Sequence, residues 1–248
     1  MKYDSHVHIG FFKTKEKIFY FNPSNVISDL KEVGITHAVV MSTTQNAGID
    51  SFFDVIREFQ SIENTGIQLY PVLWCLPEML KSFSSYISAY SWRALKVHAL
   101  SQNWKDSELD KLFSYASVCN LPVIIHTGFS KYTSCRRYEK FIEKYKAVNV
   151  ILAHGQPERN VEKLVSKYSN CYLDTAFMHS QQVIRLLKSN LESKILYGSD
   201  YPVQYAHPNT RILLEENSRN ISILRDNDKN FNEINFLQVF DFKENIGK

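Results

Sequence analysis

The chain has 248 residues, of which 44% are hydrophobic and 22% are charged, an ordinary balance for a globular protein. Its formal net charge is only +3 and its lysines are dispersed, so the sequence lacks the dense basic patch that usually accompanies nucleic-acid binding. The chain has neither a signal-peptide pattern nor the roughly 20 apolar residues of a membrane span, and we expect a cytoplasmic protein without a membrane partner.

Eight short β-rich runs recur along the chain, at 2–8, 37–43, 68–74, 94–100, 122–128, 149–155, 171–176 and 194–202. Segments with helical spacing separate them. The first, SNVISDLKEVG, offers Ser24 as an N-terminal cap and Gly34 as the left-handed residue after the helix. Similar segments end at Gly66, Asn120 and Asn170, which we expect to play the same part as Gly34.

Strands that alternate with helices predict a parallel sheet, and the apolar runs indicate strands buried on both faces. Eight such units in a chain of 248 residues fit a single (β/α)8 TIM-barrel domain over 1–248. A doubly wound open sheet is the alternative, but the glycine-rich phosphate-binding turns typical of it are missing. We expect helices over 208–220 and 231–242 to close the barrel, and the aromatic stretch 11–21 to be a loop that could cover the site.

Active-site residues of such barrels gather at the carboxyl ends of the strands. Polar side chains stand at five of the eight predicted ends: His6 and His8, Lys96 and His98, His126, His154, and Asp200. Alternation along the first strand places both of its histidines on one face, with Asp4 one step deeper.

A single histidine at a strand end is usually a hydrogen-bonded core or rim residue, but the joint placement of these histidines favours another explanation. Buried imidazoles are costly unless they are paired, and converging histidines with a carboxylate provide what a divalent metal ion needs. Closure of a barrel would bring the eighth strand beside the first, so that Asp200 reaches the His6 and His8 pair. The sequence therefore predicts a metal site at the barrel mouth.

The motifs DSHVH, KVH, IIHTG, LAHG and GSDYP resemble the successive motifs of the amidohydrolase superfamily of metal-dependent barrels. Within it, the chain is most similar to the branch that contains aminocarboxymuconate-semialdehyde decarboxylase. The resemblance implies that His6, His8, His126 and Asp200 bind the metal, and that Asp200 also accepts a proton from the metal-activated water.

The resemblance also implies two roles for His154: an acid/base group beside a single metal ion, or a ligand of a second ion. Lys96 stands where two-metal relatives carry a carboxylated lysine, so this residue would share a second ion with His154. We expect one divalent ion, with Zn²⁺ preferred, and two ions as the alternative.

The implied activity is hydrolysis of an amide, ester or lactone of a small molecule. Two alternatives stay open: a nonoxidative decarboxylase of a small unsaturated or aromatic acid, and a catalytically silent metal-binding barrel. His98, Arg136 and Arg137 are weaker candidates for substrate binding, because a solvated first helical turn explains the arginines better than a substrate-binding fork does. A homo-oligomer is also left open.

Overall fold

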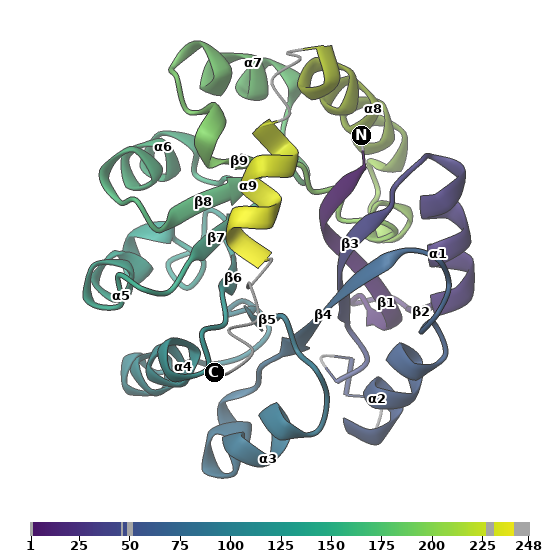
Figure 1. Cartoon of the computed structure of the whole chain (residues 1–248), viewed down its shortest axis with the longest axis vertical. Coiled ribbons are helices and arrows are strands. Elements are labelled where there is room, and N and C mark those ends of the chain that lie inside the picture. The colour runs from purple at the N-terminus through teal and green to yellow at the C-terminus, as the bar shows by residue number, and fades with distance from the viewer. Residues whose placement is uncertain (1, 46, 49–51, 227–230, 241–248) are drawn as a thin grey trace, which may run out of the picture.

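The computed structural model describes residues 2–45, 47–48, 52–226 and 231–240, and these residues form a ring of strands surrounded by helices (Figure 1). The sheet has the strand order β2-β1-β3-β4-β5-β6-β7-β8-β9, in which only β2 is antiparallel to its neighbour. The strands are β1 (Tyr3–Lys13), β2 (Ile18–Phe21), β3 (His37–Ser42), β4 (Gln68–Trp74), β5 (Ala94–Val97), β6 (Val123–His126), β7 (Val150–Ala153), β8 (Cys171–Asp174) and β9 (Ile195–Leu196).

The sheet closes because the segment that follows β9 returns to β1. Three backbone hydrogen bonds join them: Ser5 N–H to Tyr197 O (2.8 Å), Asp200 N–H to His6 O (2.8 Å) and His8 N–H to Tyr201 O (2.7 Å). A parallel bridge between Val7 and Tyr201 continues the pairing. The eight predicted strands are present as β1 and β3 to β9, and the prediction of an α/β barrel is confirmed.

Helices and short 3-10 turns connect the strands on the outside of the ring (Figure 1). The α-helices are α1 (Pro23–Glu32), α2 (Phe52–Gln60), α3 (Phe83–Ser88), α4 (Asp106–Val118), α5 (Glu139–Lys144), α6 (Glu158–Lys167), α7 (Ser180–Lys188), α8 (Thr210–Asp226) and α9 (Phe231–Phe240). The 3-10 turns are η1 (Pro77–Lys81), η2 (Cys135–Tyr138), η3 (Glu192–Lys194) and η4 (Val203–Ala206). Among the described residues, no helix has both the length and the apolar character to cross a bilayer.

The predicted helix ends are partly confirmed. Gly34 and Asn120 adopt positive φ of 80° and 54° after their helices, as expected. Helix α1, however, is capped by Asn22 rather than Ser24: the Asn22 Oδ1 accepts the N–H of Asn25, and proline occupies the first helical position. Asn170 does not have a left-handed backbone; its buried amide donates instead to the carbonyls of Ile142 in α5 and of Tyr145 and Val148 after α5.

The stretch after the first predicted strand is a hairpin rather than a loop. Strand β1 continues to Lys13 and pairs with β2, with Phe11 opposite Tyr20 and Phe12 opposite Phe19. Alternating aromatic residues suit such a pairing because their rings stack across the two strands. The carboxyl end of β1, from Gly10 to Lys13, is thus one arm of the hairpin.

Alternation divides the buried apolar residues into two layers. An inner layer fills the barrel and includes Val39, Met41, Val72, Ile124, Ile151 and Tyr172. An outer layer lies between the strands and the helices and includes Val40, Leu73, Leu95, Val97, Ile125 and Leu152. The barrel is therefore a packed core, and space for chemistry remains only at its ends.

Helix α9 closes the amino end of the barrel and crosses it in Figure 1. Its Phe236 packs against Tyr3 and Tyr70, with ring centroids 5.1 and 5.0 Å away. The side chain of Asn232 accepts the N–H of Tyr197 (2.7 Å) and donates to Tyr3 O (3.1 Å). The predicted closing helices correspond to α8 and α9; residues 241–242 of the second prediction lie outside the described residues.

Candidate metal centre

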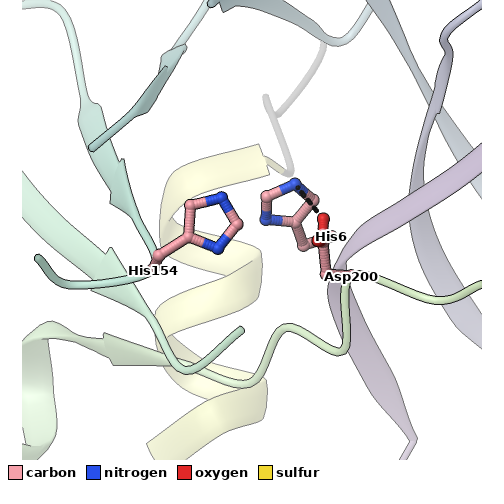
Figure 2. A group of neighbouring side chains, drawn as sticks. All are labelled: His6, His154 and Asp200. Carbon is pink, nitrogen blue, oxygen red and sulfur yellow. Dashed lines mark ion pairs between the residues drawn. The ribbon is translucent and has the colours of Figure 1, made fainter. Parts of the chain in front are cut away.

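Three side chains converge at the carboxyl end of the barrel: His6 from β1, His154 after β7 and Asp200 after β9 (Figure 2). One ligand atom from each lies within 4.8 Å of the other two, and all three residues are buried. The Nε2 of His6 is 3.0 Å from Asp200 Oδ1. The chain separates these residues by up to 194 positions, so only closure of the ring between β1 and the segment after β9 makes them neighbours.

His8 and His126 extend this group on either side. The Nε2 of His8 lies 2.8 Å from Asp200 Oδ1, and the Nδ1 of His126 lies 3.0 Å from His154 Nε2. Ligand atoms about 2.0–2.1 Å from one tetrahedral zinc ion are roughly 3.3 Å apart, so these spacings are close to those of ligands that share an ion. The donor set of imidazole nitrogens and one carboxylate also fits a zinc-type cation.

The distances also place His154 relative to the other candidates. From the sequence, we expect His154 to have either an acid/base role beside a single ion or, together with Lys96, a share of a second ion. In the structure, His154 belongs to the same cluster as His6 and Asp200. Lys96 Nζ lies 3.3 Å from His6 Nε2 in the barrel interior, and Lys96 is 1% exposed.

Asp174, at the end of β8, is a site residue that the sequence analysis missed. Its Oδ2 accepts a hydrogen bond from His6 Nδ1 at 2.8 Å, and its Oδ1 accepts the backbone N–H of His154 at 2.8 Å. In many metal centres, the histidine nitrogen that does not bind the metal donates a hydrogen bond to a carboxylate. This bond fixes the orientation of the ring and directs its Nε2 toward the metal position. The signal was available: Asp174 lies near the carboxyl end of the predicted strand 171–176, but no histidine accompanies it there.

Asp4 does not share the inner face with His6 and His8. The pairing of β1 with β3 shifts register between Asp4 and Val7, so a bulge interrupts the alternation. Asp4 Oδ1 instead accepts the backbone N–H groups of His6 (3.0 Å) and Ser199 (3.1 Å). Asp4 thus links β1 to the segment that carries Asp200.

Two of the converging residues have strained backbones. His154 has φ of 69° and Asp200 has φ of 58°, in the left-handed region that side chains other than glycine rarely occupy. Hydrogen bonds from their own N–H groups, to Asp174 Oδ1 and to His6 O, hold these conformations. Strain of this kind is concentrated at functional sites.

Comparison with known families decides the class of protein. The sequence pattern of the family described as "Amidohydrolase" matches residues 64–216, more than half of the chain. The chain belongs to the amidohydrolase family. It is an enzyme of the metal-dependent amidohydrolase type. No curated protein matches the full sequence significantly.

Solved structures of amidohydrolases share the fold at low sequence identity. A probable 2-pyrone-4,6-dicarboxylic acid hydrolase from Acinetobacter baumannii superposes with a TM-score of 0.69 at 13% identity, over 97% of this chain and 99% of that one. An amidohydrolase from Burkholderia multivorans with bound zinc has a TM-score of 0.68 at 9% identity, over 98% and 99%. The IDCase of Metarhizium anisopliae has a TM-score of 0.68 at 11% identity, over 97% of each chain. The branch that contains aminocarboxymuconate-semialdehyde decarboxylase is not singled out by these matches.

Burial controls the protonation of most histidines at the mouth of this amidohydrolase barrel. Burial lowers the pKa of His8 and of His154 to about 4, although the Asp200 carboxylate opposes the shift at both. Burial likewise lowers the pKa of His126 well below its usual value. These rings are therefore neutral at pH 7, the form that binds metal ions.

His6 and Asp200 are the exceptions. Burial and Lys96 lower the pKa of His6, but the charges of Asp174 and Asp200 outweigh them and raise it above its usual value. Burial opposes ionisation of Asp200, but His6 and His8 hold its pKa well below the usual range. Asp200 is therefore a carboxylate at neutral pH. Burial lowers the pKa of Lys96 to about 8, with Asp200 and Asp174 opposing.

The weaker substrate-binding candidates lie in different surroundings. His98 is part of the mouth, since its ring centroid is 4.2 Å from that of His126. Arg137 instead binds Asp106 through Nε (3.3 Å) and Nη2 (3.1 Å), and Arg136 donates to Asn160 Oδ1 at 3.1 Å. Both arginines are thus occupied on the outer helices, and an arginine fork for substrate stays a prediction without support from these contacts.

Proposed function

We propose that this protein hydrolyses an amide, ester or lactone of a small molecule, with a divalent cation, preferably one Zn²⁺ ion, at the barrel mouth. The observation that carries the proposal is the convergence of His6, His154 and Asp200 within 4.8 Å of one another. The name of the Acinetobacter baumannii structure, a probable 2-pyrone-4,6-dicarboxylic acid hydrolase, adds support for a cyclic ester among the candidate substrates.

Five donors lie in this cluster or directly against it: His6, His8, His126, His154 and Asp200. An ion with four protein ligands and a fifth position open for water or substrate needs fewer protein ligands than this. We assign His6, His8, His126 and Asp200 to the ion, which supplies Lewis-acid activation of water at neutral pH. The remaining histidine, His154, is neutral and can donate an N–H to the oxyanion that develops on the substrate carbonyl.

Asp200 has the properties of the general base. It is ionised at neutral pH, and its Oδ1 lies within 3.0 Å of both His6 Nε2 and His8 Nε2, at the centre of the cluster. A carboxylate in this place can accept a proton from the attacking water and return it to the leaving group. Asp174 holds the His6 ring in position while this happens.

The test is metal analysis of the purified protein followed by a panel of esters, lactones and amides. We expect turnover that stops after treatment with a chelator and returns on addition of Zn²⁺. A chain that retains the metal but turns over no member of the panel would instead be a silent metal-binding barrel. A parallel screen of unsaturated and aromatic acids for CO₂ release distinguishes hydrolysis from the nonoxidative decarboxylase alternative.

We also propose that residues 1–248 form one domain, because the described strands share a single ring. A small molecule is the natural partner of a site enclosed at the mouth of a barrel. The cytoplasmic location, the lack of a nucleic-acid partner and the oligomeric state remain predictions.

A further inference from the structure

A second cavity lies outside the ring of strands, between helices α1 and α8. Its volume is about 480 Å³, within the range of sites for small molecules. Its most buried lining residues are Asp4, Tyr197 and Ser199, at the junction where the segment after β9 pairs with β1. None of the proposed metal ligands is among the residues that line it, so this cavity is separate from the barrel mouth.

Every charged side chain that lines this cavity is acidic: Asp4, Asp29 and Glu32. Asp4 is 1% exposed, whereas Asp29 and Glu32 are exposed residues of α1. Asp29 accepts a hydrogen bond from the Tyr201 hydroxyl, but none of the three carboxylates forms an ion pair within the described part of the chain. Walls that carry one sign of charge attract a ligand of the other sign, here a cation.

Two buried side chains leave hydrogen-bonding atoms unused at the same cavity. Asn217 of α8 is 8% exposed; its Nδ2 donates to Ser199 O at 2.8 Å, and its Oδ1 has no partner among the residues that the structure describes. Tyr197 is 3% exposed, and its hydroxyl has no partner among those residues either. An amide oxygen only accepts and a hydroxyl can accept, so both suit a ligand that donates N–H groups.

The remaining wall of the cavity is aromatic and aliphatic. Tyr201 and Tyr205 both line it, and their ring centroids are 6.0 Å apart. Leu30 of α1 and Leu214 and Ile221 of α8 add hydrocarbon surface. Tyrosine rings attract cations through their faces, and apolar walls favour a ligand with a hydrocarbon body.

A bare metal ion does not suit this cavity. Among the described residues, the only group of three potential ligand atoms within 4.8 Å of one another is that of His6, His154 and Asp200. The carboxylates of Asp4, Asp29 and Glu32 do not form such a group. The charge of the cavity is therefore spread along its wall, which suits an extended organic cation better than an ion that gathers its ligands around one point.

We propose that the cavity between α1 and α8 binds a primary organic amine in its ammonium form. An ammonium group has three N–H donors, and Asp4, Tyr197 and Asn217 provide three acceptors for them. The apolar body of the amine lies between the two helices, against the tyrosine rings. This site does not depend on the proposed hydrolase function.

The test is isothermal titration calorimetry of the full chain with 2-phenylethylamine, metal-free and again loaded with Zn²⁺. At neutral pH this amine is an ammonium ion, and 2-phenylethanol has the same body without the charge. We expect saturable binding of one amine with a Kd below about 1 mM in both samples. The alcohol should bind at least about tenfold more weakly, because it lacks the charged donor.

Matched variants locate the bound amine. Tyr197→Phe removes only the hydroxyl and should weaken binding about fivefold; Tyr172→Phe, in the barrel interior, is its control. Glu32→Gln removes a charge from an exposed residue and should weaken binding about twofold, even if Tyr197→Phe fails to fold. Glu143→Gln removes the same charge from the exposed face of α5 and should leave the affinity unchanged.

Two results would overturn the proposal directly: no saturable binding of the amine up to about 10 mM, or equal affinities for the amine and the alcohol. Unchanged affinity in both Tyr197→Phe and Glu32→Gln would place the amine elsewhere on the protein. Binding that requires Zn²⁺ would place it at the metal centre, which also contradicts the proposal. Failure of the hydrolase proposal shows itself differently, as a lack of metal-dependent turnover, and leaves the titration of the metal-free chain unaffected.

Discussion

Asp174 Oδ2 lies 2.8 Å from His6 Nδ1, and both side chains are fully buried. The contact joins the end of β8 to the beginning of β1, 168 positions apart in the chain. It leaves the Nε2 of His6 facing Asp200 and the rest of the cluster. The orientation of the first histidine therefore depends on a residue that does not itself belong to the converging group.

Asp174→Asn should weaken Zn²⁺ binding by about 10- to 100-fold, because the amide no longer holds the His6 ring with a charged acceptor. Competition with a chromophoric chelator measures the affinity. Asp110→Asn removes the same charge from a half-exposed carboxylate paired with Lys144 and should leave the affinity unchanged. Equal affinities for the two variants would show that Asp174 does not support the metal site.

Zn²⁺ affinity should fall as the pH decreases. At first the fall should correspond to one proton, which His6 takes up and which Zn²⁺ must displace. Metal binding requires an unprotonated His6, and the pKa of His6 is raised, so protons compete for its Nε2 first. His8, with a pKa of about 4, and His126, with a pKa well below its usual value, compete only in more acidic solution. Between the pKa of His6 and about pH 5, affinity should change about tenfold per pH unit. A steeper slope in that range, measured by chelator competition, would contradict this order of protonation.

Asp200→Asn should lower kcat by about a thousandfold or more, because the amide cannot accept a proton from water. The fold should persist, since asparagine tolerates the left-handed backbone that Asp200 adopts, with φ of 58°. Steady-state kinetics on a substrate found in the panel, together with a thermal melt, provide the measurement. Near-normal turnover would remove Asp200 from the role of general base.

Phe236→Ala should reduce the free energy of unfolding by about 3–5 kcal/mol, because it opens a cavity between α9 and the amino end of the barrel. Ile234→Ala, on the exposed side of the same helix, should change it by no more than about 0.5 kcal/mol, since Ile234 is 58% exposed. Urea unfolding of both variants tests the comparison. A small effect of Phe236→Ala would mean that α9 does not close the core.

The barrel itself could be predicted from the sequence because its signals are local. Each strand and helix shows its own period of apolar residues, and the order of the units then limits the topology. The strand-end residues His6, His8, His126, His154 and Asp200 could be found in the same way. The hairpin formed by β1 and β2 was missed, since eleven residues with aromatic side chains on both sides of a charged turn fit a loop equally well.

The sequence by itself thus determined the class of fold, the family and most of the residues that stand at the mouth, Asp174 excepted. Only the tertiary structure decided how they contact one another. The bulge that turns Asp4 away from His6, the left-handed backbone of His154 and Asp200, and the carboxylate of Asp174 behind His6 all depend on the register between strands. Register is set by pairing between distant segments when the ring closes, and no local period of the chain records it.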